Sequence, residues 1–579
     1  MKTLKGLAVS SGISLGPAFV FHDDEESAIP RYSITEKETD GEWQRLQAAI
    51  EKTKNDISVL RDRTVQETGL ENGAIFEAHL MMLDDPDVQE SMEHALKTSL
   101  LNIEWIVHQH EQSLVKRLES LSDPLLKERS LDIHDITRRI LDHLMFKERF
   151  SLADLSHDII LVSRNLLPSD MISMDRKHVL GIVMDAGGKT SHTAILARAF
   201  EIPAVLGLGG ASKLVKYGDK LIVDGNSGEV IVEPDKPTME YFEKLKAEVL
   251  KRDKFYSSVA ELPAKTSDGK EILVKANIEV PEETDSVLRH GAAGVGLFRS
   301  EFLFMQPGLM PSEEAQFKAY KKVLAALPGK AVTIRTLDLG GDKLIKEIAQ
   351  EGEKNPLLGW RAIRYCLSDR VLFKNQLRAI LRASIYGEAR LMFPMISGPE
   401  ELDATLAILE EAKEECRKKG QAFKEDLPVG IMIEVPSAAM TADILAEKAS
   451  FMSIGTNDLI QYTIAVDRGN EKVAYLYEPY HPAILRLIKK VVDDGHGAGI
   501  PVSMCGEMAS DPMSAILLLG LGMDELSMSA VSVPSVKHAL RSVNLKEAEE
   551  AAVMALKCKS HKMVEAILKS KFGDRLDSI

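Results

Sequence analysis

The stretch Gly294-Val-Gly-Leu-Phe-Arg-Ser-Glu301 is a short apolar run that ends abruptly in charged side chains. A run of this length, introduced by glycine, is typical of a strand that is buried on both faces. Comparable runs recur through the C-terminal half, with helical segments between them, at residues 272–276, 332–334, 391–394, 430–433, 451–454, 501–504 and 525–528. Eight strands that alternate with helices predict a closed (β/α)8 barrel of the TIM type, and a doubly wound open sheet is the alternative.

The polar residues at the ends of these runs favour the barrel. One run leads into Arg299 and Glu301, and four others lead into reactive side chains of their own: Arg335 and Asp338, Glu434, Asn457 and Asp458, and Cys505 and Glu507. A single charged residue in a loop is usually only solvated, but barrel enzymes gather their active sites at the C-terminal ends of the strands. Five strands that end in this way therefore predict a catalytic rim.

The residue types at this rim narrow the choice of ligand. Four arginines are expected there or in nearby loops: Arg299, Arg335, Arg361 and Arg468. Guanidinium groups bind phosphate and carboxylate through paired hydrogen bonds, and Glu434 and Asp458 offer the hard oxygen ligands that Mg²⁺ prefers. Any one arginine could instead form a surface salt bridge, but the group predicts a small, multiply anionic substrate bound together with Mg²⁺.

Cys505 has two interpretations. It follows the apolar run 501–504, and a buried cysteine usually behaves as a small hydrophobic residue. At a strand end that faces an anion site, its thiol can instead donate a proton. The remaining cysteines, Cys366, Cys416 and Cys558, are far apart in the sequence and form no Cys-x-x-Cys pair. This spacing argues against zinc ribbons and disulfide frameworks, and it favours a reducing, cytoplasmic location.

The N-terminal half changes character twice. Residues 4–9 and 16–21 are typical of strands, whereas residues 34–146 are typical of long helices, with one apolar stripe running from Trp43 to Leu60. From residue 151 buried strands return, at 158–162, 179–184, 221–223 and 229–232. The two opening strands need a sheet, and this one is the nearest. We therefore expect a helical bundle inserted into an α/β domain, followed by a charged connecting helix.

A second candidate reactive centre follows the strand at 179–184. Gly187 and Gly188 permit a tight turn, and Thr190 and Ser191 are good helix N-caps. His192 is therefore expected in the first turn of a helix, where free N–H groups stabilise an anion such as a phosphoryl group on the ring. A lone histidine is more often structural, and a metal ligand is a further alternative. No second ligand lies at metal-binding spacing, which disfavours the metal.

Composition excludes several classes of protein. The 579 residues carry a formal net charge of −16, and nucleic-acid binding depends on a basic surface, so a DNA or RNA partner is not expected. No apolar run is long enough to span a membrane, and the first residues lead into no signal-peptide core. An acidic surface suits a small basic protein partner, although charge alone is weak support.

Taken together, the motifs resemble those of a known family. Residues 187–193, Gly-Gly-Lys-Thr-Ser-His-Thr, are similar to the phosphohistidine signature of the phosphoenolpyruvate (PEP)-utilising enzymes. The segments that resemble the family's barrel motifs are 294–305, 335–343, 355–361, 430–434, 453–458, 466–470 and 504–507. The similarity is greatest to the branch that begins the bacterial phosphotransferase system of sugar uptake. It covers nearly the whole chain, including residues 76–83 of the helical insertion.

The resemblance implies a role for each matching residue. His192 would be the nucleophile that accepts the phosphoryl group of PEP, and Cys505 would protonate the enolate to give pyruvate. Glu434 and Asp458 would bind Mg²⁺, and the remaining ligands of PEP would be Arg299, Arg335, Arg361, Asn457, Asp458 and Arg468. The helical insertion would dock HPr, the small phosphocarrier that accepts the group on a histidine of its own. The family forms homodimers through the barrel. Many members carry arginine where this chain has Lys189. Lysine keeps the positive charge but lacks the two parallel donors with which arginine binds a phosphoryl group.

These expectations give a multidomain α/β organisation. Residues 1–32 and 148–232 would form a swivelling phosphohistidine α/β domain, 33–147 the inserted HPr-binding bundle, 233–265 a linker helix and 266–579 the barrel. One alternative is an enzyme of the pyruvate–phosphate dikinase or PEP synthase type, but the chain before His192 is short for an ATP-binding domain and has no Walker loop. The other alternative is a regulatory adaptor without catalysis, against which the retained reactive residues argue.

Overall fold

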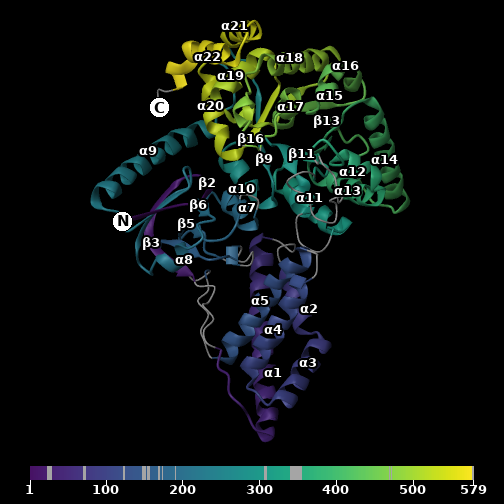
Figure 1. Ribbon diagram of the computed structural model, residues 1–579. Coiled ribbons are helices and arrows are strands. Elements are labelled where there is room, and N and C mark those ends of the chain that lie inside the picture. Colours follow the sequence, from purple (N-terminus) through teal and green to yellow (C-terminus); the bar gives the residue numbers. More distant parts are fainter. Residues whose placement is uncertain are drawn as a thin grey trace. The chain divides into compact units, whose positions relative to one another are not determined.

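The computed structural model describes residues 1–21, 29–68, 74–120, 124–145, 152, 155, 157–166, 170–171, 174–188, 191–304, 310–339, 355, 357–468, 470 and 472–576. The chain folds into two compact units that divide between Val249 and Leu250 (Figure 1). The first unit holds a sheet and a bundle of helices, and the second holds a barrel. Each unit is described separately below.

The second unit contains the predicted closed barrel. Its strands are β9 (Leu273–Ile278), β10 (Val295–Arg299), β11 (Ala331–Arg335), β12 (Glu388–Phe393), β13 (Val429–Ile433), β14 (Phe451–Ile454), β15 (Val502–Met504) and β16 (Glu525–Ser529). Every neighbouring pair is parallel, and β16 pairs with β9 to close the ring. The open-sheet alternative is therefore wrong. Each of the eight strands overlaps a predicted apolar run, because a strand buried on both faces has few polar residues.

Helices surround the barrel and bury their apolar sides against it (Figure 1). They are α10 (Thr284–Arg289), α11 (Glu313–Ala326), α12 (Ile363–Ser368), α13 (Arg370–Ala383), α14 (Pro399–Lys418), α15 (Pro436–Met440), α16 (Ala442–Ala446), α17 (Thr456–Ile464), α18 (Pro482–Gly497), α19 (Pro512–Leu521), α20 (Val533–Arg541), α21 (Leu545–Leu556) and α22 (His561–Leu576). In α18, Ile484, Ile488 and Val491 recur at helical spacing and are fully buried, which explains how the helix is oriented.

The first unit contains one sheet in the order β1-β8-β7-β3-β4-β5-β6-β2. Its strands are β1 (Lys2–Lys5), β2 (Leu7–Ser10), β3 (Ile13–Phe21), β4 (Ile159–Ser163), β5 (Val179–Met184), β6 (Ala204–Leu206), β7 (Lys220–Asp224) and β8 (Glu229–Val232). The expected single strand at 4–9 is wrong. Gly6 divides it, so that β1 pairs with β8 and β2 pairs with β6. A side chain on Gly6 would lie 2.6 Å from the Leu206 carbonyl oxygen, which explains the glycine.

The helical segment is an insertion, as expected, because β3 and β4 on either side of it are adjacent parallel strands. It contains α1 (Thr39–Thr68), α2 (Ala74–Leu83), α3 (Pro86–Ser99), α4 (Ile103–Ser120) and α5 (Pro124–Leu144). In the stripe predicted on α1, Leu46, Ile50 and Ile57 are at most 2% exposed. In α3, Val88, Met92 and Leu96 recur at helical spacing, and Met92 and Leu96 are buried in the core of the bundle.

The charged connector forms helix α9 (Lys236–Ala260). Near its start, Phe242 packs with Ile222 and Ile231 of the first unit. At its end, the Ala260 carbonyl accepts a hydrogen bond of 2.7 Å from Lys537 of α20. Among the described helices, none combines the length and the apolar character needed to cross a membrane.

Candidate active site

The predicted site residues of the barrel lie where its strands end. Arg299 and Arg335 are the last residues of β10 and β11, and they are direct partners in the register of these two strands. Glu434 follows β13, and Cys505 follows β15. Asn457 and Asp458 lie in the first turn of α17, which begins just after β14. The strand order thus brings residues that are far apart in the sequence to one rim.

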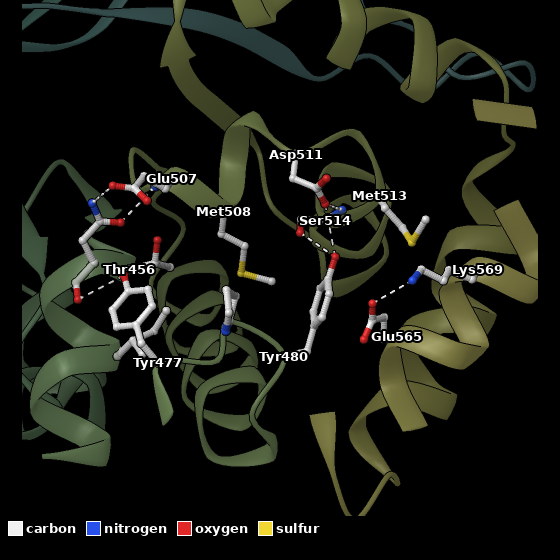
Figure 2. Close-up of a pocket in the computed structure, with 13 residues that line it drawn as sticks. Thr456, Tyr477, Tyr480, Glu507, Met508, Asp511, Met513, Ser514, Glu565 and Lys569 are labelled. Carbon is white, nitrogen blue, oxygen red and sulfur yellow. Dashed lines mark hydrogen bonds and ion pairs between the residues drawn. The ribbon is translucent and has the colours of Figure 1, made fainter. Parts of the chain in front are cut away.

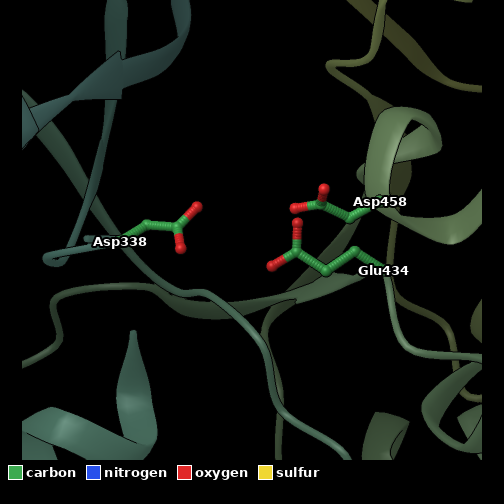
Figure 3. A group of neighbouring side chains, drawn as sticks. All are labelled: Asp338, Glu434 and Asp458. Atoms are coloured by element: carbon green, nitrogen blue, oxygen red, sulfur yellow. The ribbon is translucent and has the colours of Figure 1, made fainter. Parts of the chain in front are cut away.

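Three carboxylates converge at this rim. Oxygen atoms of Asp338, Glu434 and Asp458 lie within 4.8 Å of one another, and Figure 3 shows Glu434 beside Asp458 with Asp338 facing them. Burial, together with the neighbouring Asp458 and Asp338, raises the pKa of Glu434 well above its usual value. A compact group of buried oxygen ligands fits a divalent cation, which would offset the repulsion between these charges.

Two buried arginines flank the carboxylates. Asp338 accepts from Arg335 at 3.0 Å and from Arg361 at 2.7 Å, and Arg361 also lies 3.5 Å from Asp458. Burial works against the charge of Arg335, but Glu301 and Asp338 outweigh it and raise the pKa of the guanidinium. Both arginines therefore stay charged inside the protein, and their guanidinium groups could bind an anion once a cation offsets the neighbouring carboxylates.

Each of these two arginines has a hydrogen-bond donor without a partner among the described residues. The Nε atoms of Arg335 and Arg361 are buried and have no hydrogen-bond partner among the described residues. A buried donor without a partner costs about 1–3 kcal/mol. The unpaired donors indicate that this part of the rim is organised for a further anionic group.

Arg299 and Arg468 are more open to solvent. Arg299 is paired with Glu279, which follows β9, at 2.6 Å. Arg468 is exposed in the segment after α17, where its backbone N–H donates to Gln461. Their exposure suits residues that meet a substrate entering from solvent, whereas Arg335 and Arg361 lie deeper.

Asn457 is held by a reciprocal pair of hydrogen bonds with Glu507. Its side-chain amide donates to the Glu507 carboxylate at 3.0 Å, and its oxygen accepts from the Glu507 backbone N–H at 3.0 Å. Gly506 allows this approach, since a side chain there would lie 1.7 Å from the Thr456 hydroxyl. The loop after β15 is thereby fixed against the start of α17.

Cys505 is buried, with 4% of its surface exposed. Its pKa is raised mainly by burial, and the nearby Arg335 and Arg299 oppose the shift only in part. The group is therefore a protonated thiol near neutral pH. This state fits both the hydrophobic interpretation and the proton-donor interpretation.

His192 lies in the first unit, where it begins helix α7 (His192–Ala199). The expected N-cap is present: the Ser191 hydroxyl accepts from the Ala194 N–H at 3.3 Å. The loop before it starts at Asp185, whose carboxylate accepts from the backbone and hydroxyl of Ser212. Lys189 and Thr190 lie outside the described residues. The structure thus places His192 at a helix N-terminus, as expected, and on a different unit from the other site residues.

Asp338 and Glu301 were predicted at strand ends, but without a role. In the structure, Asp338 is the third carboxylate and the bridge between two arginines, and Glu301 pairs with Arg335 at 2.5 Å. Tyr462, which accepts from Arg361 at 3.2 Å, was missed altogether. The sequence offered one indication of these contacts: Arg335 and Asp338 lie three residues apart at the end of a strand.

The chain is similar to known proteins along nearly its whole length. Three regions match PEP-utilising enzymes: residues 5–129 match the N-terminal region, 155–228 the mobile domain and 254–545 the PEP-binding domain. The phosphoenolpyruvate-protein phosphotransferase of Priestia megaterium is 41% identical over 99% of both chains, and that of Bacillus subtilis (strain 168) is 40% identical over 99% of this chain and 100% of its own. The Haemophilus influenzae protein of the same name is 41% identical over 96% of both chains. The chain belongs to the family of PEP-utilising enzymes.

Proposed function

We propose that this chain transfers the phosphoryl group of PEP to its own His192 and then to a histidine of HPr, releasing pyruvate, as the first step of sugar uptake by the phosphotransferase system. The chain is an enzyme: relatives at about 40% identity over nearly its full length are phosphoenolpyruvate-protein phosphotransferases. The observation that carries the proposal is the barrel rim, where buried arginines with unpaired donors surround three converging carboxylates.

PEP carries a phosphate and a carboxylate, and the rim offers a positive group for each. Arg335 and Arg361 are the deep ligands in this proposal, Arg299 and Arg468 the outer ones, and Asn457 and Asp458 complete the set. Fixing both ends of a small substrate converts a bimolecular reaction into one between held groups. The same arginines neutralise charge on the phosphoryl group as it moves.

Glu434 and Asp458 would hold Mg²⁺, with Asp338 as a third candidate ligand. Their buried, hard oxygen atoms fit this ion. Bound Mg²⁺ supplies positive charge to the phosphate and enolate oxygens, which is its usual role in phosphoryl transfer.

The reaction then needs two groups of this chain. A ring nitrogen of His192 attacks the phosphorus atom, and the bond from phosphorus to the oxygen on C2 breaks, which leaves the enolate of pyruvate. The protonated thiol of Cys505 donates its proton to C3 of that enolate, and solvent later reprotonates the sulfur. Its raised pKa supports this role, because a thiol that keeps its proton at neutral pH is available as an acid.

His192 and the barrel rim belong to different units, so the proposed cycle needs the phosphohistidine domain (residues 1–32 and 148–232) to meet the barrel (266–579) and then to release it. The linker at 233–265, which contains α9, would permit this swivelling, and the bundle at 33–147 would dock HPr. The proposal includes a homodimer formed through the barrel; Val371 on α13 and Met440 on α15, which are 71% and 57% exposed, are two apolar side chains that such an interface would cover.

The test uses PEP with a radioactive phosphoryl group, incubated with the full chain and Mg²⁺. We expect acid-labile label on the wild type and none on His192→Ala. His178→Ala, which removes a histidine of the same unit that pairs with Asp158, is the matched control and should be labelled normally. Addition of HPr should remove the label. Label that survives His192→Ala would identify another acceptor, and an unlabelled wild type would favour a non-catalytic adaptor.

A further inference from the structure

The barrel unit contains a cavity that adjoins the proposed PEP site and lies mostly outside it. Its volume is about 360 Å³, and it is lined by residues from the start of α17, the segment between α17 and α18, the loop after β15, and helices α19 and α22. Figure 2 shows Glu507 at one end and Lys569 at the other. The cavity touches the proposed PEP site only through Asn457 and its partner Glu507.

Its charges are predominantly negative. Three carboxylates line it, from Glu507, Asp511 and Glu565, against the single ammonium group of Lys569. That ammonium group is engaged by Glu565 at 2.9 Å. A ligand therefore meets an excess of negative charge, which disfavours anions such as PEP and favours a cation.

The carboxylates are arranged unlike those of a metal site. Asp511 accepts from the Ser514 N–H and from the Tyr480 hydroxyl, and Glu507 accepts from Asn457. Among the described residues, the carboxylates whose oxygen atoms converge within 4.8 Å are those around Glu434, and none of them lines this cavity. A bare divalent ion would find no common centre here.

The rest of the lining is aromatic and apolar. Tyr477 and Tyr480 contribute rings, and the Met508 side chain lies between them in the view of Figure 2. Burial and the nearby Glu507 raise the pKa of Tyr477 to about 12, so its ring is neutral and electron-rich. Aromatic faces attract organic cations, and methionine adapts to apolar groups of irregular shape.

One further polar group lines the cavity. Thr456 is fully buried, and its hydroxyl has no hydrogen-bond partner within the described part of the chain. A buried polar atom without a partner is an expected feature of a ligand site in its free state. Figure 2 shows Thr456 at the same end of the cavity as Glu507.

We propose that this cavity binds a small organic cation, namely an ammonium or guanidinium group carried on an apolar or aromatic body. The carboxylates of Glu507 and Asp511 attract the charge, and the two tyrosines with Met508 cover the body. The proposal is independent of phosphoryl transfer, because binding here needs neither PEP nor His192.

The test is calorimetric titration of the full chain with benzylammonium, with benzyl alcohol and benzoate as neutral and anionic ligands of the same ring. We expect saturable binding of one benzylammonium per chain, and affinities at least about tenfold lower for the other two, since each lacks the charge that the carboxylates attract. Equal affinity for all three ligands, or no saturable binding of benzylammonium, would overturn the proposal.

Matched variants locate the site. Glu507→Gln keeps the acceptor for Asn457, and Asp511→Asn keeps a good N-cap for α19. Each should weaken benzylammonium binding about twofold to fivefold, the size of one partly exposed charge pair. Benzylammonium binding should be unchanged in Glu549→Gln, which replaces an exposed acid on α21, and in Glu434→Gln, which alters the proposed metal site. Wild-type affinity in the first two variants, or a loss in either control, would place the cation elsewhere and refute the site. Thermal melts verify that each variant is folded.

Discussion

Replacement of Asp338 by asparagine should leave two buried arginines short of negative charge. Asp338 is 5% exposed and bridges Arg335 and Arg361, whose side chains are 7% and 8% exposed. Asparagine has nearly the same shape as aspartate, so the substitution leaves little empty space. The change in the free energy of unfolding therefore comes mainly from the lost charge. Arg335 keeps Glu301 at 2.5 Å, whereas Arg361 keeps the carboxylate of Asp458 at 3.5 Å and the hydroxyl of Tyr462 at 3.2 Å.

The magnitude follows from this burial. Removing one partner of a buried ion pair costs about 3–5 kcal/mol, and the retained partners place Asp338→Asn at the lower end. For a unit of this size we expect the unfolding temperature of the barrel to fall by about 5 °C. PEP supplies anionic oxygens to the same arginines. The stabilisation that PEP gives should therefore be larger in the variant than in the wild type, by about 1 kcal/mol.

Differential scanning calorimetry in EDTA, with and without PEP, measures both effects without a contribution from a divalent metal. Glu313→Gln is the matched control. It too removes a carboxylate that bridges two arginines, Arg378 and Arg382, both at 2.8 Å, but on the outer helices α11 and α13. It should cost about 1 kcal/mol or less and respond to PEP as the wild type does.

Two results would refute this reasoning. An Asp338→Asn barrel that unfolds at the wild-type temperature would show that the two arginines do not depend on this carboxylate. Equal PEP-induced shifts in Asp338→Asn and the wild type would show that PEP does not contact the arginines that Asp338 bridges.

Three further predictions concern single groups. Cys505→Ser should slow pyruvate release about a hundredfold if the thiol is the proton donor. Cys558→Ser, whose cysteine is equally buried at 4% exposed, should release pyruvate at the wild-type rate. A lactate dehydrogenase-coupled assay measures both rates, and equal rates in the two variants would contradict the proton-donor role of Cys505. Burial raises the pKa of Glu283 to about 7 from 4.5, so its contribution to stability is full below pH 4.5 and is lost as the pH rises through 7. Relative to the wild type, the free energy of unfolding of Glu283→Gln should therefore increase by about 1–2 kcal/mol between pH 5 and pH 8, as measured by urea titration. A difference between the two proteins that does not vary with pH would count against the shifted pKa. Val371→Glu and Met440→Glu should each shift a barrel-mediated dimer toward monomers in sedimentation velocity, and an unchanged dimer would show that the substituted side chain lies outside the interface.

The barrel strands could be predicted because burial on both faces leaves an unbroken apolar run. Their boundaries were less accurate where the barrel interior is polar. Strand β12 begins at Glu388 rather than Leu391, and its Arg390 pairs with Glu525 of β16. Lys275, inside β9, is 2% exposed and also pairs with Glu525, at 2.6 Å. A polar residue with a buried partner far along the chain cannot be told from a loop residue by sequence pattern.

The site could be predicted at the level of which residues reach the rim, because strand ends share one end of a barrel. Contacts between them could not. That Asp338 would join Arg335 to Arg361 depends on how the segment after β11 folds back, and nothing in the local sequence reports it. The cavity lined by Glu507 and Asp511 could not be predicted from the sequence for the same reason. Its lining comes from four separate segments, represented by Thr456, Tyr480, Asp511 and Lys569.

The sheet of the first unit also constrains the order in which the chain can fold. Its outermost strands, β1 and β2, both come from the first ten residues, and Lys2 pairs with Val232 while Leu7 pairs with Leu206. During synthesis these strands wait, unpaired, until residues beyond the helical insertion have left the ribosome. Contacts so distant in sequence form slowly, and unpaired strand edges invite association with other chains. We therefore expect β1 and β2 to complete the two edges of the sheet late in folding, and truncation of those ten residues should favour aggregation.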